Sequence, residues 1–203
     1  MSEPLLTVAF ADDEPGMLQV LQTACKSKYE IVGTAKNGLE AIQLVKIAKP
    51  NILVLDNHMP LLDGMEALKQ ITLLKTTAVV MITADEDPTL ARLALDEGAC
   101  GYIRKPFEYA QIVPMLESAW HHFQLAQNLQ KELAAMSESL ETRKLLEKAK
   151  GILMEQQGFT EEEAHKTIQK MSQDQGITVK ELCRSLIQVK MILGNKAKSK
   201  KVA

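Results

Sequence analysis

Five short apolar runs, separated by segments with helical spacing, constrain the fold of this chain more than any other feature. They occupy residues 8–11, 30–35, 52–55, 78–83 and 100–104. Short runs of β-branched and other apolar residues are typical of strands that are buried on both faces. In the segments between them, apolar residues recur three and four positions apart, as in Met17, Leu18, Leu21 and Ala24, like one face of a helix. The alternation predicts an α/β fold, a doubly wound (βα)5 parallel sheet with helices on both faces.

Polar residues stand where four of these strands end. They are Asp12 and Asp13 after the first strand, Asp56 after the third, Thr83 at the end of the fourth and Lys105 after the fifth. In open α/β sheets the carboxyl ends of the strands share one edge, where ligands bind, so we expect these side chains to meet. Carboxylates supply the hard oxygen ligands of Mg²⁺ and can attack a phosphoryl group, while an ammonium and a hydroxyl can hold its oxygens. The residues predict a site for a Mg²⁺-assisted aspartyl phosphate.

Four motifs occur around these positions: FADDE (10–14), LVLDNHMPLLDG (53–64), ITA (82–84) and GYIRKPF (101–107). In order and approximate spacing they resemble the receiver domains of two-component response regulators, over roughly the first 120 residues. The resemblance implies that Asp56 is the phosphoacceptor and that a sensor histidine kinase is the phosphodonor. It also implies that Asp13, Asp56 and the backbone carbonyl of His58 bind Mg²⁺, with Asp12 assisting through a water molecule.

The same resemblance implies that Thr83 and Tyr102 form a switch pair and that Lys105 contacts the phosphoryl group. The bond between Lys105 and Pro106 would be a cis peptide. Tyr102 as ordinary core packing is the alternative interpretation. The side chain of His58 either hangs over the phosphoryl group or points to solvent, and we prefer solvent. The pair Asp63-Gly64 is interpreted as a turn before the next helix.

Composition favours a cytoplasmic signalling protein. A chain of 203 residues with 46% hydrophobic residues is long enough for one full domain and a smaller one. Its three cysteines are scattered and lie in apolar patterns, which predicts buried thiols, and its four histidines lack zinc-ligand spacing. No apolar stretch approaches the ~20 residues of a membrane helix, so we expect no membrane partner. Nothing in the sequence indicates a site for turnover of an external metabolite, and we do not expect an enzyme.

Charge and periodicity suggest four parts: a receiver domain over 1–122, a helical coiled-coil linker over 112–143, a second domain over 138–193 and a basic flexible tail over 194–203. Residues 1–136 carry 11 Lys and Arg against 17 Asp and Glu, whereas residues 137–203 carry 13 against 9. The basic second part permits a nucleic-acid partner.

The linker contains a heptad stripe. One set of positions is Ile112, Ala119, Ala126, Leu133 and Leu140, and the companion set is Met115, Leu129 and Met136. Apolar residues at both sets are the seam of a coiled coil, which predicts a parallel homodimer. Pro114 is tolerable only near the helix start, and His122 interrupts the stripe. An amphipathic helix that folds back on its own receiver domain would use the same residues.

Beyond the linker the sequence predicts a small three-helix bundle. The first helix ends at Gly158, and Gly176 ends the second. Thr160 with Glu163, and later Thr178 with Glu181, have the spacing of capping boxes that start the second and third helices. The apolar residues of these segments suffice for one small core.

Residues 141–187 also resemble the ANTAR domain, through the AKGILM run at 149–154, Gly158 and the Glu- and Ala-rich helix that follows. The resemblance implies binding to stem-loops in nascent messenger RNA and transcription antitermination. It leaves two alternatives open, a bundle that binds a protein partner and one that binds DNA.

The candidate RNA contacts are Arg143, Lys144, Lys148, Lys150 and Gly151. Lysine and arginine can hold phosphates, and a glycine in mid-helix costs about 1 kcal/mol relative to alanine, which suggests close approach of another surface. Specific RNA recognition favours unpaired loop bases, which can lie against such an opened face. The alternative is that these cations are solvated and that the glycine relieves crowding between helices.

Overall fold

The structure is a computed structural model that describes residues 5–85 and 87–199. It divides the chain into two compact units, Met1–Asn128 and Leu129–Ala203, and this boundary falls inside the predicted linker. No helix in the described ranges is long and apolar enough to cross a membrane.

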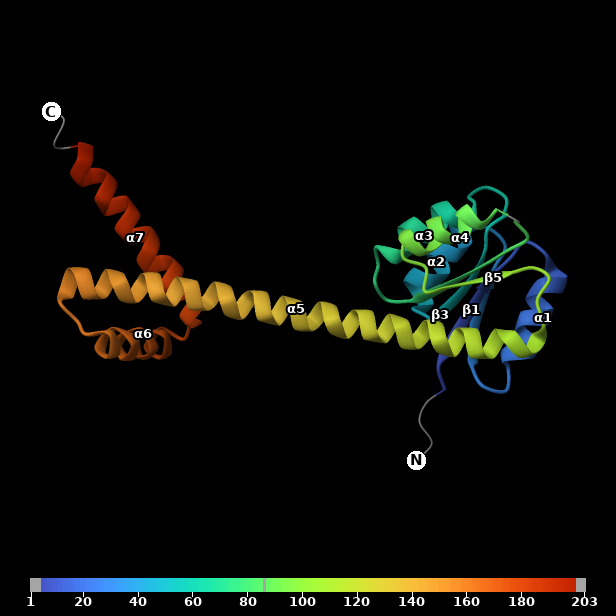
Figure 1. Cartoon of the computed structure of the whole chain (residues 1–203), viewed down its shortest axis with the longest axis horizontal. Helices are drawn as coiled ribbons and strands as arrows, with labels where there is room; N and C mark the ends of the chain where they lie inside the picture. Colours follow the sequence, from blue (N-terminus) through green and yellow to red (C-terminus); the bar gives the residue numbers. More distant parts are fainter. Residues whose placement is uncertain (1–4, 86, 200–203) are drawn as a thin grey trace. The chain divides into compact units, whose positions relative to one another are not determined.

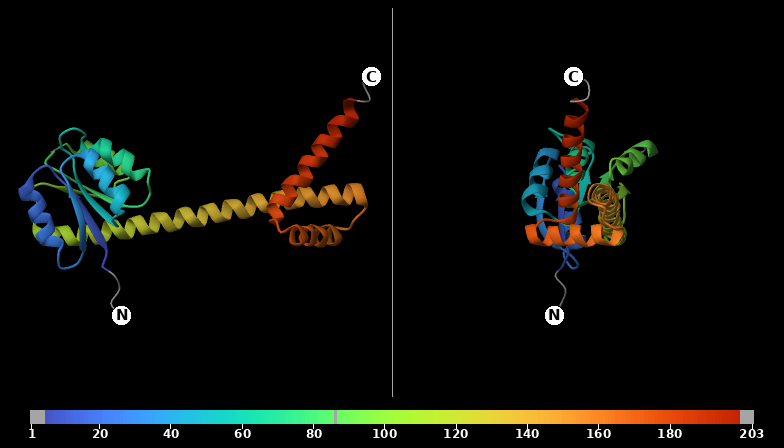
Figure 2. Two further views of the ribbon diagram at one scale, coloured as in Figure 1. Left: turned by 180° about the vertical axis from the view of Figure 1, so that it is seen from behind. Right: turned by 90° about the vertical axis from the view of Figure 1, so that its left-hand side faces the viewer.

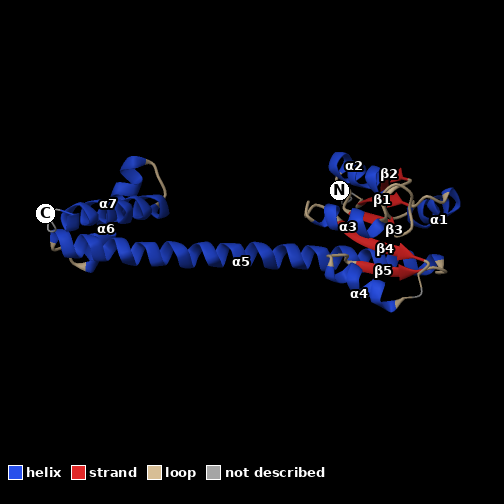
Figure 3. Ribbon diagram, turned by 90° about the horizontal axis from the view of Figure 1, so that it is seen from above, coloured by secondary structure: helices blue, strands red, loops and turns tan. Residues whose placement is uncertain are grey.

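The strands of the first unit form one parallel sheet in the order β2-β1-β3-β4-β5 (Figure 3). Their bounds are β1 Thr7–Ala11, β2 Glu30–Ala35, β3 Ile52–Asp56, β4 Ala78–Thr83 and β5 Gly101–Arg104. Every residue of β3 and β4 is buried, as expected for central strands covered on both faces. The connections that follow β1 and β3 run toward opposite edges of the sheet, so a crevice lies between the carboxyl ends of these two strands. The predicted doubly wound α/β sheet is confirmed.

Helices cover both faces of this sheet (Figure 1). Their bounds are α1 Pro15–Cys25, α2 Gly38–Ala48, α3 Gly64–Thr72, α4 Pro88–Asp96 and α5 Tyr109–Gln157. Leu53 and Leu55 of β3 face the core beneath α2, α3 and α4, whereas Val54 faces the core beneath α1 and the first turns of α5. Alternate residues of one strand therefore supply two separate cores.

The heptad stripe of α5 is used in two different ways. Ile112 and Ala119 are fully buried against the sheet, so the start of the stripe packs in cis on its own receiver unit. Leu129, Leu133 and Leu140 are instead 51%, 66% and 59% exposed. The prediction of one coiled-coil seam from residue 112 is wrong for its first part, because the sheet needs a cover on that face.

The second unit contains the end of α5, α6 (Glu161–Gln175) and α7 (Val179–Ser199). Figure 2 shows α6 lying alongside the end of α5. The core that joins the three helices consists of Ala149, Leu153, Ala164, Ile168, Leu182 and Cys183. The predicted three-helix bundle is therefore present.

The predicted helix ends of this bundle are confirmed. The Thr160 side chain accepts a hydrogen bond from the backbone N–H of Glu163, and the Glu163 carboxylate accepts one from the backbone N–H of Thr160. Thr178 and Glu181 form the same reciprocal pair before α7. Gly176 caps α6 in the left-handed region, with a φ of 64°, a conformation that glycine adopts without penalty.

The first part of the predicted tail over 194–203 is helical, because α7 continues to Ser199, and its flexibility stays a prediction. The segment after Gly194 lacks proline and is built from residues that tolerate a helix, and one internal glycine costs only about 1 kcal/mol. Residues 200–203 lie outside the described part of the chain.

Gly151 is exposed within α5, and no described atom beyond its own helix turns lies within 4 Å of a Cβ built there. The interpretation that this glycine relieves crowding between helices is therefore wrong. Its helix-propensity cost is not offset by any packing inside the described bundle.

We expect Gly151→Ala to stabilise the bundle by about 1 kcal/mol, because alanine restricts the unfolded chain and meets no neighbour. Urea unfolding followed by far-UV circular dichroism measures the effect. The matched control is Gly158→Ala, which has the same chemistry at a φ of 71° and should destabilise by about 1 kcal/mol. A loss of stability in Gly151→Ala would contradict the open environment.

Candidate functional site

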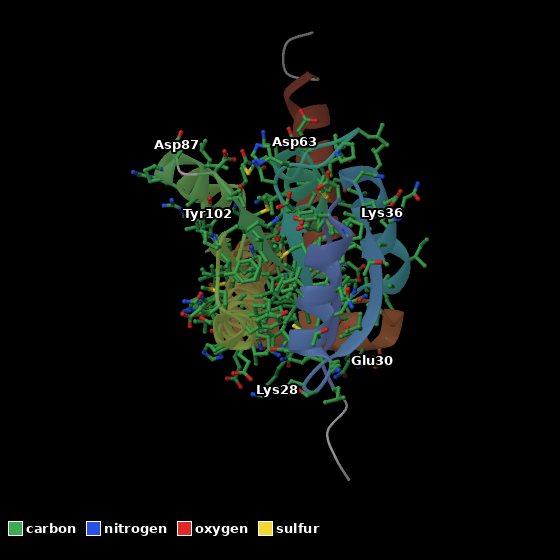
Figure 4. All side chains as sticks on the ribbon, turned by 90° about the vertical axis from the view of Figure 1, so that its right-hand side faces the viewer. Lys28, Glu30, Lys36, Asp63, Asp87 and Tyr102 are labelled. Atoms are coloured by element: carbon green, nitrogen blue, oxygen red, sulfur yellow. The ribbon has the colours of Figure 1, made fainter. Side chains whose placement is uncertain are left out.

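The carboxyl ends of three strands meet through one lysine. The Nζ atom of Lys105, which follows β5, donates to Oδ2 of Asp12 at 2.9 Å and to Oδ1 of Asp56 at 2.7 Å. Asp12 follows β1, and Asp56 is the last residue of β3. Figure 4 shows Lys36, Asp63 and Asp87, which follow β2, β3 and β4, at one end of the sheet, with Lys28 and Glu30 at the opposite end.

Both carboxylates are buried, Asp12 with 1% and Asp56 with 5% of its surface exposed. Burial raises the pKa of Asp56 above its ordinary value, although the hydrogen bond and the charge of Lys105 work in the opposite direction. Burial opposes the charge on Lys105, but its bonds to Asp56 and Asp12 outweigh burial and raise the pKa of the amine. The ammonium thus makes a buried pair of carboxylates tolerable.

Backbone groups fix the orientation of each carboxylate. The N–H of His58 donates to Oδ2 of Asp56 at 2.8 Å, and the N–H of Glu14 donates to Oδ1 of Asp12 at 2.9 Å. Lys105 is held by its own backbone N–H, which donates to the carbonyl of Thr83 at 2.8 Å. The peptide between Lys105 and Pro106 is cis, as expected.

Gly64 does more than end a turn. A Cβ built on it would lie 2.1 Å from the backbone carbonyl oxygen of Asp56, so only glycine permits this approach of α3 to the acceptor strand. Its N–H donates to the carbonyl of Asn57 at 2.8 Å. Asp63 caps α3 by accepting from the N–H of Glu66. The interpretation of Asp63-Gly64 as a mere turn missed this contact, which depends on the tertiary fold.

Thr83 is fully buried, and its hydroxyl lies 3.3 Å from Oδ2 of Asp85. Asp85 also receives a hydrogen bond from Nδ2 of Asn57. The side chain of His58 is 67% exposed, in agreement with the preferred solvent orientation, and its Nε2 atom lies 3.5 Å from the same carboxylate oxygen. Sequence reasoning missed Asn57 and Asp85, although Asn57 lies within the LVLDNHMPLLDG motif and Asp85 directly follows ITA.

Tyr102 is half-buried and packs against the core beneath α2, α3 and α4. Burial and then the charge of Asp85 raise the pKa of its phenol. The residue therefore contributes to packing, and it lies in β5, which pairs with the strand that ends at Thr83. Its role as a switch pair with Thr83 stays a prediction.

The residues present fit Mg²⁺. Two buried carboxylates at the strand ends favour a positive charge between them, and exposed Asp13 follows Asp12 directly in the chain. Within the described ranges no three Asp, Glu, His or Cys side chains form a ready cage. Mg²⁺ typically takes one or two carboxylates and completes its shell with waters and phosphate oxygens, so a full cage is unnecessary.

The candidate RNA contacts fall into two groups. Lys150 is 7% exposed, and its amine lies 2.8 Å from Glu147 and 2.7 Å from Glu161. Its hydrogen bonds to these two glutamates raise the pKa of the amine. The ion pair between Lys150 and Glu161 therefore joins α5 to α6. The sequence alone did not predict it, because it depends on how the chain turns between the two helices.

Arg143, Lys144 and Lys148 are exposed on α5, and among the described residues they form none of the ion pairs found in this unit. Several other cations of the unit are paired internally, for example Lys180 with Glu141 at 2.9 Å. Positions 144, 148 and 151 are separated by four and three residues, which places both lysines and Gly151 on one side of the helix. The two lysines and the open glycine, with unpaired Arg143 at their flank, make up a basic face on α5.

We expect Lys105→Met to destabilise the receiver unit by roughly 3 kcal/mol near neutral pH, because it leaves two buried carboxylates without a cation. The raised pKa of Asp56 means that the folded unit takes up its proton more readily than the unfolded chain, so the loss should fade as the pH falls toward 3.8. Thermal unfolding across that range tests this. Adding Asp56→Asn to the same chain should restore part of the stability at neutral pH, because only Asp12 then lacks a cation, and the absence of any recovery would contradict the role of charge.

Comparisons with known proteins agree with both units. The model of the response regulator receiver domain matches residues 8–117, and that of the ANTAR domain matches residues 134–187. The chain is 36% identical over 182 residues to the transcriptional regulatory protein PdtaR of Mycobacterium tuberculosis, which covers 89% of each protein. It is 36% identical over 117 residues to the chemotaxis protein CheY of Listeria monocytogenes, covering 57% of this chain and 98% of that protein.

Among solved structures, the response regulator domain of Thermotoga maritima CheB is similar, with a TM-score of 0.54 and 32% identity over 60% of this chain and 98% of that one. A receiver domain followed by an ANTAR domain is a regulatory arrangement. The chain belongs to the response regulators that join an N-terminal receiver domain to a C-terminal ANTAR domain.

Proposed function

We propose that Asp56 accepts a phosphoryl group from a sensor histidine kinase and that the C-terminal unit binds stem-loops in nascent messenger RNA as a transcription antiterminator. The observation that carries the first half is the buried carboxylate of Asp56, held between the ammonium of Lys105 and the N–H of His58. A transcriptional role is supported by the name of PdtaR, the transcriptional regulatory protein to which this chain is similar.

In the transfer step an oxygen of Asp56 attacks the phosphorus atom of the donor. A bond between that oxygen and phosphorus forms, and the bond from phosphorus to the donor nitrogen breaks, with its electron pair passing to the donor. Lys105 lies against the attacking carboxylate and can hold an oxygen of the transferred group. The donors that orient Asp56 are in place before the reaction, so little rearrangement is needed for attack.

Asp12, Asp13, Asp56 and the backbone carbonyl of His58 would hold Mg²⁺, which when bound neutralises charge on the phosphoryl oxygens. The role of Asp12 and Asp56 in the unphosphorylated chain is to present a buried acidic pair that attracts such a cation. Lys105 already provides one positive charge there and keeps the pair together.

We expect Asp56→Asn to abolish phosphorylation, because an amide cannot form the acyl phosphate. Intact-protein mass spectrometry after incubation with Mg²⁺ and a small phosphoryl donor shows the added mass in wild type. Asp13→Asn is the matched comparison, since it removes a nearby exposed carboxylate and should slow the reaction without removing the acceptor. Labelling of Asp56→Asn at the wild-type level would refute the assignment.

For the RNA, we propose that the basic face of α5, formed by Arg143, Lys144, Lys148 and Gly151, meets the stem-loop. The lysines would contact phosphates, and loop bases would lie against the helix at Gly151, where no described side chain intervenes. Lys150 is excluded from this role, because its buried amine already serves two glutamates.

Replacing Lys144 or Lys148 with alanine should weaken binding to a two-hairpin leader RNA and reduce the slope of log affinity against log salt by about 1 each. Fluorescence anisotropy at several salt concentrations provides both values. The control is Lys166→Ala on α6, where an exposed lysine is paired with Glu162 and should have little effect on binding. Lys150→Met should instead lower the free energy of unfolding.

Competition with duplex DNA tests the two alternatives. Preference for hairpin RNA supports the antiterminator. Equal binding to duplex DNA would favour the DNA-binding interpretation, and no nucleic-acid binding with or without the phosphoryl donor would favour a protein partner.

We also propose that α5 pairs with α5 of a second copy. Leu129, Leu133, Met136 and Leu140 remain exposed at heptad spacing after both units have folded. Lys180 of α7 pairs with Glu138 and Glu141, which lie off this stripe, so the bundle leaves it uncovered. Pairing would bring two RNA-binding units together and raise the apparent affinity for two adjacent hairpins.

The double change Leu133→Lys and Leu140→Lys should abolish pairing, because it places like charges along the stripe. Sedimentation velocity with and without a phosphoryl donor measures the dimer. Ile47→Lys alters an equally large side chain that is 84% exposed on α2 and should leave the dimer unchanged. A monomeric wild-type protein in both conditions would contradict the proposal.

A further inference from the structure

Asp85, in the loop between β4 and α4, is the centre of a side-chain network that the proposed transfer step does not use. Its Oδ2 atom lies 3.3 Å from Oγ1 of Thr83, 3.2 Å from Nδ2 of Asn57 and 3.5 Å from Nε2 of His58. Its backbone N–H donates in turn to Oγ1 of Thr83, at 3.1 Å. One carboxylate oxygen therefore gathers the hydroxyl at the end of β4 and both residues that follow the acceptor Asp56.

Backbone hydrogen bonds hold Asn57, one of the partners of Asp85, in place. Asn57 donates from its backbone N–H to Ile82, and its carbonyl accepts from Gly64. Its side-chain Oδ1 is buried and has no hydrogen-bond partner within the described residues. A buried amide oxygen without a hydrogen bond lowers the stability of the arrangement that contains it. The backbone of Asn57 is thus fixed, while the unpaired oxygen of its side chain would gain a hydrogen bond in another arrangement.

We propose that Asp85 is a positioning residue that holds the Thr83 hydroxyl until a phosphoryl group on Asp56 takes it. The proposal rests on Asp56 being the phosphoacceptor. A threonine hydroxyl has a single proton to donate, so Thr83 cannot serve the Asp85 carboxylate and a phosphoryl oxygen at once. The two arrangements exclude each other, which makes the Thr83 side chain a two-state element.

Electrostatic repulsion also favours the transfer of the Thr83 hydroxyl from Asp85 to the phosphoryl group. An acyl phosphate carries a charge of about −1.5 to −2 where the Asp56 carboxylate carried −1, and it brings strong acceptor oxygens. The ammonium of Lys105 is shared by Asp12 and Asp56, and its described contacts do not include Asp85. The Asp85 carboxylate, 36% exposed, is thus repelled by the new charge while it loses its hydroxyl donor. Release of Asp85 frees the loop that leads into α4.

It follows that Asp85 opposes activation. Its bonds stabilise the unphosphorylated arrangement, and a phosphoryl group must overcome them before Thr83 can turn. A chain without this carboxylate should hold a phosphoryl analogue more tightly, because neither the competing acceptor nor the repulsion remains.

The test uses the full-length chain with Mg²⁺ and beryllofluoride, an analogue of the phosphoryl group, and measures the dissociation constant by ¹⁹F NMR titration. Asp85→Ala should bind about 10-fold more tightly than wild type, the scale of one hydrogen bond to a charged group. Asp85→Asn keeps an acceptor but loses the charge, and should fall between them. Asp96→Asn, which removes an exposed carboxylate at the end of α4, should bind as wild type does.

A second measurement separates positioning from a general change in stability. In the unbound Asp85→Ala chain, the methyl resonance of Thr83 should move toward its position in analogue-bound wild type. In a Thr83→Ala background, Asp85→Ala should have a smaller effect on affinity, because the shared hydroxyl is gone.

The outcomes distinguish this proposal from the one on which it rests. If wild type binds the analogue and Asp56→Ala does not, but Asp85→Ala binds no more tightly than wild type, the holding role is overturned while the phosphoacceptor stands. If wild type itself fails to bind, the acceptor assignment and the role of Asp85 fall together.

Discussion

The ammonium of Lys105 between Asp12 and Asp56 is the interaction on which the rest of the receiver unit depends. Two buried carboxylates at the ends of neighbouring strands would otherwise repel each other in a place where water cannot screen them. The lysine comes from β5, at the edge of the sheet, so its two hydrogen bonds connect that edge to the crevice between β1 and β3. The site is therefore held by tertiary structure, and it exists only when the whole sheet is formed.

Much of this arrangement was readable from the sequence. Strand positions were predicted to within about one residue, because runs such as 52–55 are apolar throughout and have few other uses in a parallel sheet. The starts of α6 and α7 followed from Thr160 and Thr178 with their partner glutamates, since a capping box is a local pattern that needs no tertiary information. The approach of Asp12, Asp56 and Lys105 followed from topology alone.

What the sequence did not reveal depends on contacts between distant segments. Gly64 looks like any turn glycine until α3 is placed against the backbone of Asp56. Lys150 carries the same charge as Lys148, and only the return of α6 buries it beside Glu161. The heptad stripe of α5 has one chemical pattern but two environments, because the sheet covers Ile112 and leaves Leu133 exposed. Periodicity identifies an apolar face without saying what will cover it.

The hydrogen bond from Thr83 to Asp85 has a consequence for the kind of signal this receiver can carry. The Thr83 hydroxyl donates its one proton either to Asp85 or to a phosphoryl oxygen, so each molecule is in one of two states. An intermediate response of the population then arises from the fraction of molecules in each state, which the free-energy difference between the two arrangements determines. The strength of this one bond is part of that difference, so it contributes to how completely a phosphorylated population responds.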